Sequence, residues 1–382
     1  MPFFTDPMKI LLTSGPGGHF YPMIAIAEKL NELAVEEKII DLELFYISDS
    51  AYDQRALEDN HIKFYKLETG KRRVYFSILN FLDIFKTMYA TLRAILMVYK
   101  IFPDVVFSKG GYSAVPVTIA ARFLGIPLVI HESDSVPGRA NKMAGKWAKR
   151  IAISYTEAVE HFPKDKTAFV GHIVRKEVRE PLKDGAFEYL KLQSSLPVLF
   201  VIGGSQGAKL INETVLNALP ELLPKYQVIH QTGVKNFDEV KGVSEIILKD
   251  LEFKKNYYPY PYLNKLAIRM SAGVASLVVS RAGAGLIGEI ACWGLPSIII
   301  PITNSNGDHQ RNNAFNYARI GACTVIEENN LQPHVLISEI NRILDDTNLQ
   351  NSMKEATKSF VFPDAEGKVA KEIINIALTH ES

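Results

Sequence analysis

Short apolar runs and helix-period segments alternate along the first half of the chain. The runs "KILLTS", "LELFYIS", "DVVFSKGG", "PLVIHES" and "RIAIS" are typical of strands that are buried on both faces. Between them lie segments such as "PMIAIAEKLNELA", in which Ile24, Ala27, Leu30 and Leu33 share one face of a helix. The pattern predicts an α/β fold in which helices cover both sides of a parallel sheet.

The same pattern starts again in the second half. "PVLFVIGG", "YQVIHQTG", "ASLVVS" and "PSIIIPIT" are expected strands, and "SQGAKLINETVLNALPELL", "RAGAGLIGEIACWG" and "DHQRNNAFNYARIG" are expected helical segments. The polar stretch "GHIVRKEVREPLKDG" separates the two halves. We therefore expect an N-terminal domain over residues 1–172 and a C-terminal domain over 173–345. A helical segment over 346–382 follows, and its tail is one amphipathic helix that buries Val369, Ile373, Ile376 and Ala377.

Composition narrows the class of protein. The chain has 382 residues, of which 47% are hydrophobic and 22% charged, as in a globular protein of two domains. Its net charge of +1 excludes whole-molecule attraction to nucleic acid, so no nucleic-acid partner is expected. Two cysteines give neither a disulfide framework nor a zinc pattern, which suits a reducing cytoplasm. The start "MPFFTDP" lacks the basic and apolar regions of a signal peptide.

Four glycine-rich turns follow predicted strands. They cover residues 15–18, 110–111, 203–207 and 283–285. Ligands of parallel sheets sit at the carboxyl ends of the strands, and helix N-termini there favour phosphate. Each turn alone could equally serve tight helix–strand packing. Four turns in two domains favour a large anionic ligand, although "GPGGH" does not match a dinucleotide fingerprint and Asp49 lies too far along to support one.

Several polar residues beside these turns are candidates for chemistry. His19 follows the first turn, where a helix N-terminus favours a neutral imidazole that can accept a proton; the alternative is a residue that caps or packs the loop. Glu289 suits the two hydroxyls of a ribose, or merely complements a helix dipole. Two further groups suit sugar hydroxyls or form ordinary polar loops: Asp308, His309, Gln310 and Asn313 in "DHQRNNA", and Glu132, Asp134 and Asn141 in "HESDSVPGRANK".

Residues 71–99 carry more apolar side chains than one helix face needs. A helical stripe runs through Ile78, Leu82, Phe85, Tyr89, Leu92, Leu96 and Tyr99, and Phe76, Leu79, Phe81, Ile84 and Met88 fall largely outside it. Basic residues border the segment: Lys71, Arg72, Arg73, Lys86 and Arg93. The combination favours a contact with an anionic membrane surface, with Arg72, Arg73, Leu79, Leu82 and Phe85 as its candidate residues. The alternative is a helix pair buried in the first domain.

Taken together, these motifs resemble those of the MurG family. The matching stretches are "SGPGGHFYP", "SKGGYSAVP", "HESDSVPGRANK", "GGSQGA", "SRAGAGLIGEIACWGLPSIIIP" and "DHQRNNA", which run from about Lys9 to the last helix. These are the bacterial N-acetylglucosaminyltransferases of glycosyltransferase family 28. The resemblance implies a GT-B fold, with two Rossmann-like domains whose parallel sheets face each other across a cleft. It implies that the last helix returns to the first domain.

The resemblance also implies an activity and its partners. GlcNAc would pass from UDP-GlcNAc to the 4-hydroxyl of the MurNAc sugar in lipid I, with inversion, giving lipid II for peptidoglycan. The enzyme would sit peripherally on the cytoplasmic face of the membrane, near proteins of cell-wall synthesis and division. No Asp-x-Asp metal clamp is seen, so we expect no metal and no cofactor. The alternatives are another GT-B transferase acting on a diacylglycerol-type lipid, a UDP-sugar epimerase, or a non-catalytic sugar-nucleotide-binding module.

Matching motif positions assign roles to individual residues. The donor site is expected to contain Ser205 and Gln206 at the diphosphate, Arg175 at the nucleotide, Glu289 at the ribose, backbone at Ala284, Gly285 and Leu286, His309 and Gln310 at GlcNAc, uracil near Tyr262, and Asp134 near the transferred sugar. Gly17 and Gly18 belong to the first glycine loop, on the acceptor side, and are also expected to contact UDP-GlcNAc. The acceptor side is expected to contain Gly15, His19, Tyr112 and Asn141.

Two residues depart from the family pattern. Pro16 stands where a threonine is frequent, and Asp134 replaces a frequent asparagine. Asp134 can therefore act as a base or orient one, and the general base is left open between His19 and Asp134.

Overall fold

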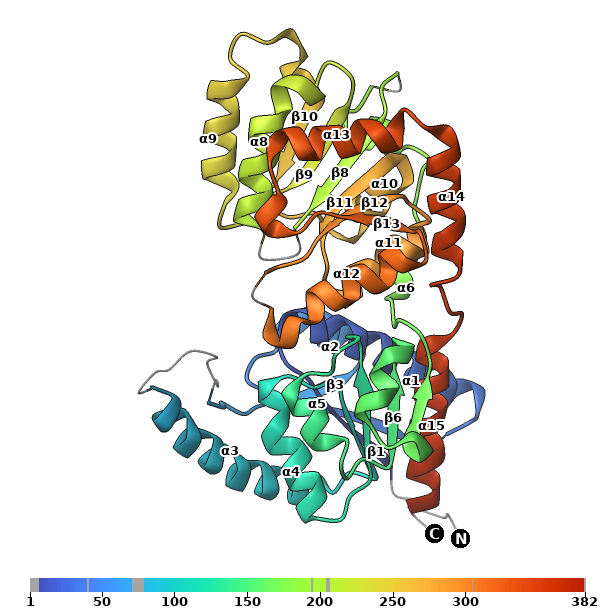
Figure 1. Cartoon of the computed structure of the whole chain (residues 1–382). Coiled ribbons are helices and arrows are strands. Elements are labelled where there is room, and N and C mark those ends of the chain that lie inside the picture. The colour runs from blue at the N-terminus through green and yellow to red at the C-terminus, as the bar shows by residue number, and fades with distance from the viewer. Residues whose placement is uncertain are drawn as a thin grey trace. The chain divides into compact units, whose positions relative to one another are not determined.

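The chain folds into two compact units. The computed structural model describes residues 7–39, 41–70, 79–193, 195–203, 207–303 and 305–380. Unit 1 contains the chain up to Arg175 together with Phe362 onward, and unit 2 contains Lys176–Val361 (Figure 1). The first unit ends at Arg175, three residues beyond the domain boundary that the sequence analysis expected after residue 172. The helical segment expected at 346–382 is divided, because residues 346–361 belong to unit 2.

Unit 1 is built on a parallel sheet with strand order β3-β2-β1-β4-β5-β6-β7, counted over the described residues. The strands are β1 (Met8–Thr13), β2 (Leu42–Ser48), β3 (Ile62–Lys66), β4 (Val105–Ser108), β5 (Leu128–Glu132), β6 (Arg150–Ile153) and β7 (Thr167–Phe169). The longer helices are α1 (Phe20–Glu36), α2 (Gln54–Asp59), α3 (Leu79–Ile101), α4 (Val115–Phe123), α5 (Arg139–Ala144) and α15 (Ala365–His380). α1, α2 and α15 cover one face, and α3, α4 and α5 cover the other.

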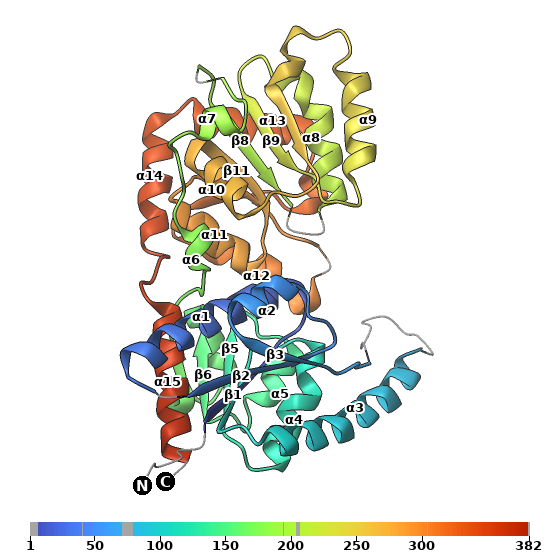
Figure 2. The same ribbon diagram turned by 180° about the vertical axis from the view of Figure 1, so that it is seen from behind.

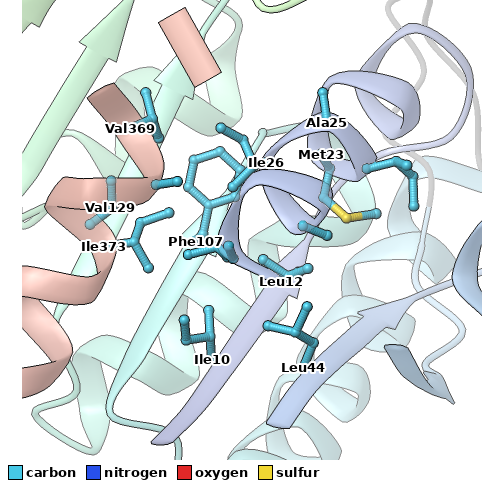
Figure 3. Packing of buried hydrophobic residues seen from close by; sticks show 14 of the residues in the cluster. Ile10, Leu12, Met23, Ala25, Ile26, Leu44, Phe107, Val129, Val369 and Ile373 are labelled. Carbon is cyan, nitrogen blue, oxygen red and sulfur yellow. The ribbon is translucent and has the colours of Figure 1, made fainter. Parts of the chain in front are cut away.

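The last helix is part of the unit 1 core. Val369 and Ile373 of α15 pack against Ile26 of α1 and Phe107 of β4 (Figure 3). Ile373 is fully buried, as are Ile376 and Ala377 on the same face of the helix. Removing these side chains from water is what brings the end of the chain back to unit 1.

Unit 2 repeats the architecture with strand order β10-β9-β8-β11-β12-β13 in its described residues, all parallel (Figure 1). The strands are β8 (Val198–Ile202), β9 (Gln227–Gln231), β10 (Tyr257–Tyr260), β11 (Ala275–Arg281), β12 (Ser297–Ile300) and β13 (Cys323–Val325). The helices are α6 (Lys176–Arg179), α7 (Ala186–Tyr189), α8 (Lys209–Leu222), α9 (Phe237–Ile247), α10 (Lys265–Val274), α11 (Ala284–Trp293), α12 (His309–Arg319), α13 (Pro333–Leu344) and α14 (Thr347–Lys358). Met353 of α14 is buried in the unit 2 core, which explains why residues 346–361 stay with this unit.

Candidate functional site

Two glycine loops touch at the carboxyl edge of the first sheet. β1 and β4 are neighbours, so the loops after them meet. The N–H of Gly15 donates to the carbonyl of Gly110 at 2.7 Å. Gly111 has a φ of 90°, and a Cβ there would lie 2.6 Å from the Gly15 Cα. Glycine is required because the two backbones approach closer than any side chain allows.

His19 and Asn141 lie against this pair of loops. His19 ends the short 3₁₀ turn η1 (Gly17–His19) and directly precedes α1, where it is half-buried. A Cβ on Gly15 would lie 3.2 Å from its ring edge, and a Cβ on Gly110 would lie 2.7 Å from Oδ1 of Asn141. The structure therefore brings His19, Asn141 and both glycine loops together. Gly17 and Gly18 belong to the same loop and have open space beside their Cα atoms.

Glu132 organises the loop after β5. Its side chain is 3% exposed and accepts hydrogen bonds from the N–H of Asp134 (2.9 Å), the N–H of Gly138 (3.1 Å) and the Asn141 amide (3.0 Å). Burial raises the pKa of this carboxyl, the charge of Asp134 adds to the rise, and Lys109 opposes it. Asp134 itself is half-buried, two residues beyond the strand. Glu132 thus holds Asp134 and Asn141 in place.

Lys109 is a site residue that the sequence analysis missed. It directly follows β4 and is only 1% exposed, yet no described protein atom accepts a hydrogen bond from its ammonium group. Burial lowers its pKa to about 8, against the opposing charges of Glu132 and Asp134. The sequence feature that could have identified Lys109 is its position between a buried strand and a glycine turn.

Tyr112 is oriented by Asp49. Its hydroxyl, on the 3₁₀ turn η2 (Tyr112–Ala114), donates to the Asp49 carboxylate at the end of β2. The hydroxyls of Ser48 and Ser113 both donate to the carbonyl of Ser14, at 2.8 and 3.1 Å. Burial is the main cause that raises the pKa of Tyr112, so the phenol stays protonated as a donor. Asp49 positions a tyrosine in this structure.

Arg175 lies in unit 1, against an aromatic ring. Its guanidinium carbon is 3.9 Å from the centroid of the Tyr21 ring, and the residue is 8% exposed. Such a stacked cation–π contact fixes the side chain in one place. The structure therefore places Arg175 beside α1, at the end of unit 1, and not among the unit 2 residues that follow it.

In unit 2, the N-terminus of α11 offers hydrogen-bond donors. Ala284, Gly285 and Leu286 form its first turn after the N-cap Gly283, and the first bond within the helix is Ile287 N–H to Gly283 O. The three preceding N–H groups have no partner within the helix, and the dipole adds a positive end. No atom lies within 4 Å of a Cβ built on Gly283 or Gly285, so a ligand can approach the backbone closely. Glu289 is half-buried one turn later.

The start of α12 lies beside this turn. His309 is its first residue, and the side-chain carbonyl of Gln310 accepts from the N–H of Ile302 at 3.2 Å. Asn313 is fully buried and donates to the carbonyl of Ala282 at 3.3 Å, so it joins α12 to the loop before α11. His309 and Gln310 are brought close to the α11 turn, whereas Asn313 has a structural role. Asp308 precedes them with a φ of 58°.

The structure gives fewer contacts for the other residues that were expected at the UDP-GlcNAc site. Ser205 and Gln206 lie outside the described residues. They are followed by Gly207, whose Cβ would lie 2.5 Å from the Asn236 amide nitrogen. Tyr262 is 50% exposed, and the N–H of the next residue donates to Gln231 Oε1 at 3.0 Å. The first loop follows β8 and the second follows β10, and β9 lies between these two strands in the sheet.

Comparisons with known proteins give the same family for both units. Residues 10–153 match the model of the glycosyltransferase family 28 N-terminal domain, and residues 198–369 match that of the family 28 C-terminal domain. The chain belongs to glycosyltransferase family 28. It is therefore an enzyme of the glycosyltransferase class, with the two Rossmann-like domains of a GT-B fold.

Individual relatives cover nearly the whole chain. A Clostridium botulinum protein is 35% identical over 353 residues, which are 91% of this chain and 94% of that protein. It is named UDP-N-acetylglucosamine–N-acetylmuramyl-(pentapeptide) pyrophosphoryl-undecaprenol N-acetylglucosamine transferase. A Bacillus cereus protein with this name and the number 2 is 35% identical over 92% of this chain and 95% of its own. Among solved structures, MurG of Acinetobacter baumannii has a TM-score of 0.73 at 24% identity, over 97% of this chain and all of that one, which shows the shared fold.

The apolar stripe that the sequence analysis identified within residues 71–99 is exposed in this family 28 chain, wherever the structure describes its side chains. Arg72 and Arg73 lie outside the described residues, as do the side chains of Leu79 and Leu82, whose backbone belongs to α3. Phe85 is 55% exposed. The same face continues along α3 through other large apolar side chains that are 60–64% exposed: Met88, Tyr89, Leu92, Leu96 and Tyr99.

The buried face of α3 is made of smaller residues. Ala90, Ala94, Val98 and Ile101 pack against the sheet, and α3 runs beside α4 with its N-terminal half extending away from the strands (Figures 1 and 2). The alternative of a helix pair buried in the domain is therefore wrong for this face. Within the described residues, no helix is long and apolar enough to cross a bilayer. The same residues contain no cluster of His, Cys, Asp and Glu arranged to hold a metal ion.

Proposed function

We propose that this family 28 enzyme transfers GlcNAc from UDP-GlcNAc to the C4 hydroxyl of MurNAc in lipid I. The products are lipid II and UDP. The observation that carries the proposal is the match of both halves to relatives bearing that name, over 91% of the chain at 35% identity. The structure supports it with a polar cluster at the loops of unit 1 and with open helix N-termini in unit 2.

The proposed chemistry is an inverting displacement. A base takes the proton of the acceptor hydroxyl while its oxygen attacks C1 of GlcNAc, and the bond from C1 to the UDP oxygen breaks. Negative charge then grows on the diphosphate. The first-turn N–H groups of Ala284, Gly285 and Leu286 are preorganised donors of the kind that stabilise such charge. Glu289 is the proposed acceptor for the ribose hydroxyls, and Gln310 and His309 are the proposed partners of GlcNAc.

In this proposal unit 1 recognises the acceptor. The hydroxyl of Tyr112, whose proton is donated to Asp49, accepts a hydrogen bond from the acceptor substrate, and His19 accepts the proton at the glycine loops. Asp134 is the second candidate base, because Glu132 fixes its backbone beside Asn141. Gly15 has no room for a ligand at its Cα, since Gly111 lies 3.1 Å from the position of its Cβ, so its proposed part is to let the loops meet.

The decisive experiment compares two acceptors. Purified enzyme is incubated with UDP-GlcNAc labelled in the sugar and with either lipid I or a diacylglycerol, and the labelled lipid is counted. We expect transfer to lipid I alone. Transfer to diacylglycerol would favour the other class of GT-B enzyme, and UDP-GlcNAc binding without transfer to either acceptor would favour a binding module.

A variant separates the two candidate bases. His19→Ala should lower kcat about 100-fold or more while the affinity for UDP-GlcNAc changes less than threefold, since general bases typically contribute 10²–10⁴-fold. Asp134→Asn keeps the shape of the side chain and tests the second candidate base. An unchanged kcat in His19→Ala, with a large loss in Asp134→Asn, would assign the base to Asp134.

The exposed face of α3 supports peripheral attachment to a membrane. We propose the cytoplasmic face of the cell membrane as its location, because lipid I presents its sugar there to a UDP-sugar enzyme. A contiguous exposed apolar stripe bordered by cations is the feature of proteins that lie on a bilayer without spanning it.

A further inference from the structure

Lys109 occupies the middle of the loops that form the candidate site of unit 1. It directly follows β4, which lies between β1 and β5 in the sheet. Its main-chain N–H donates to the carbonyl of Thr13, the last residue of β1, at 2.9 Å. The register of β4 against β5 brings Lys109 level with His131, one residue before Glu132. Lys109 therefore stands between the first glycine loop and the loop after β5.

The ammonium group of Lys109 is enclosed by protein. The residue is 1% exposed, and no described protein atom accepts a hydrogen bond from its Nζ atom. A buried ammonium group without an acceptor is costly, so an apolar side chain of the same length would serve a purely structural role better. A side chain with so little exposed surface also offers almost nothing to a substrate. Its charge acts on neighbours through space, and the carboxylates on which it acts are those of Glu132 and Asp134.

Glu132 has a hydrogen-bonding pattern that requires an ionised carboxylate. Its Oε1 atom accepts from the N–H of Asp134 at 2.9 Å, and Oε2 accepts from the N–H of Gly138 at 3.1 Å and from the Asn141 amide at 3.0 Å. An ionised carboxylate only accepts hydrogen bonds, whereas a protonated one carries an O–H donor on one oxygen. Protonation of Glu132 would therefore set an O–H against one of these N–H donors and release part of the loop.

Lys109 opposes this protonation. Burial raises the pKa of Glu132 and the charge of Asp134 raises it further, while the charge of Lys109 is the largest cause that lowers it. Two neighbouring carboxylates, one of them 3% exposed, need a nearby cation if both are to be ionised. The buried ammonium group of Lys109 supplies that cation.

We infer that Lys109 is a positioning residue for the transfer reaction: its buried ammonium group keeps Glu132 ionised, and the ionised Glu132 fixes the loop after β5 beside the glycine loops. That loop carries Asp134, one of the two candidate bases, and leads to Asn141. The inference rests on the proposed function, which assigns these two residues to the reaction and to the acceptor side. No bond to Lys109 is made or broken, because its effect reaches the substrate through Glu132.

Other titratable groups surround the same place. His131 of β5 and His172, which follows β7, are buried, and burial lowers the pKa of both rings, with the charge of Lys109 adding to the effect. The pKa of His172 falls to about 3 and that of His131 lies well below its usual value, so both rings are neutral near pH 7. His19 also acts on His131. A pH profile must therefore be combined with substitution of Glu132 to identify the group that titrates.

Hydrogen exchange tests the structural step without any acceptor. Exchange of the amides of Asp134 and Gly138, which donate to Glu132, is measured by mass spectrometry in the full-length enzyme. Lys109→Met should speed it about tenfold at pH 6 and less at pH 8, because a rise of about one unit in the pKa of Glu132 makes the protonated form about ten times more populated. Lys146→Met removes an exposed lysine just after α5 and is the matched control, which should exchange as the wild type does.

Transfer kinetics test the consequence for the reaction. At pH 6, kcat/KM for lipid I should fall about 10- to 100-fold in Lys109→Met, since a displacement of about 1 Å in a site can cost that much. The loss should shrink towards pH 8, which places the acid limb of the variant's pH profile at higher pH than that of the wild type. The affinity for UDP should change less than twofold. Lys109→Arg retains the charge and should exchange and transfer more like the wild type than Lys109→Met does.

A double substitution shows whether Lys109 acts through Glu132. Glu132→Gln cannot accept hydrogen bonds at both ends of its side chain, so it should release the loop at every pH. In that background Lys109→Met should change exchange and transfer by less than about threefold, and the effect should no longer depend on pH. Losses that simply multiply would mean that Lys109 acts by another route, and they would overturn the inference.

The remaining outcomes are equally decisive. Unchanged exchange in a folded Lys109→Met, as checked by urea unfolding, or an equal change in Lys146→Met, would show that Lys109 does not hold the loop. Faster exchange with unchanged transfer would show that it holds the loop but does not position the reaction. If the wild type transfers nothing to lipid I, the proposed function is at fault, and the exchange data still decide whether Lys109 fixes the loop.

Discussion

Lys109 is the residue whose environment departs furthest from what its chemistry prefers. An ammonium group that is 1% exposed and bonded to no described protein atom is costly to bury. The neighbouring carboxylates of Glu132 and Asp134 offset part of this cost. A charge retained under such conditions at the carboxyl edge of a sheet is characteristic of a functional site.

Replacing Lys109 should therefore stabilise the fold. Its pKa falls from 10.5 to about 8, which corresponds to about 3 kcal/mol against the charged form. The folded chain binds fewer protons than the unfolded chain between those pH values, so wild-type stability rises with pH across that window. Lys109→Met should have an unfolding free energy up to about 3 kcal/mol higher at pH 7, less the cost of leaving Glu132 without its counter-charge.

Urea unfolding at pH 7 and at pH 9.5 measures this effect. The advantage of the methionine variant should shrink at the higher pH, because the wild-type lysine is then largely neutral when folded. A difference that is the same at both values would show that packing, and not the charge, distinguishes the two proteins.

Gly110 offers a second test at a single position. Its φ of 82° and the 2.7 Å approach of Asn141 to a built Cβ both oppose any side chain. Gly110→Ala should push the Asn141 amide away and lower transfer at least tenfold, with UDP-GlcNAc affinity unchanged because neither Gly110 nor Asn141 is among the residues expected to bind that ligand. Gly125→Ala is the control: its φ is 74°, but no atom lies within 4 Å. We expect it to cost about 1–2 kcal/mol of stability through strain alone and to leave transfer intact.

At the scale of elements, the strands that sequence patterns missed are the edges of the two sheets. β3, β7, β10 and β13 are the outer strands, and most of their residues are partly or fully exposed. An edge strand does not need a continuous apolar run, because one of its hydrogen-bonding edges, and often one face of its side chains, is in contact with water. The central strands are buried throughout and were predictable for that reason.

The helix α3 shows why hydrophobic periodicity identifies a helix but not its buried face. Its large apolar residues are exposed, and its core contact uses Ala90 and Ala94, which let the helix approach α4 and the sheet closely. A stripe of Phe, Tyr and Leu gives the stronger pattern, but the period alone does not say whether that stripe faces the core or the outside of the protein. The proposed contact of this stripe with lipid would leave the same helical period as contact with a core.

Removing the exposed stripe should release the enzyme from vesicles. Leu92→Ser/Leu96→Ser changes side chains that are 63% and 62% exposed, so the fold loses little packing. Each change removes roughly 1.5–3 kcal/mol of apolar burial in a bilayer, and we expect at least tenfold weaker binding to phosphatidylglycerol vesicles in sedimentation. Val243→Ser/Ile246→Ser on the exposed side of α9 is the control and should bind as the wild type does. Equal loss in both variants would contradict a specific membrane face.

At the scale of the whole molecule, the candidate site residues divide between the two units. The glycine turns located the loops, because parallel strands bring their carboxyl ends to one edge. The network around Glu132 was not predictable. Two donors from the loop after β5 and one from Asn141 in α5 converge on its carboxylate, and no spacing rule separates this arrangement from an ordinary polar turn. The pairing of Asp49 with Tyr112 likewise depends on the order β2-β1-β4, in which a third strand intervenes.

The return of the last helix makes the stability of unit 1 depend on the end of the chain. Ile373 is fully buried in the unit 1 core, and Ile340 of α13 is buried to the same degree in unit 2. Truncating either to alanine should cost about 2–5 kcal/mol in its own unit. UDP stabilises the unit that binds it, so saturating UDP should raise only the unit 2 transition in calorimetry.

The effect of UDP and the effects of the two core substitutions together show which unit unfolds in each calorimetric transition. Ile373→Ala should lower the transition that UDP does not raise, and Ile340→Ala should lower the one that UDP raises. The reason is that each unit has its own hydrophobic core, and a core residue affects the stability of the domain that buries it. If Ile373→Ala instead lowers both transitions equally, the units unfold as one cooperative body, and UDP bound to unit 2 would then also stabilise the acceptor loops of unit 1.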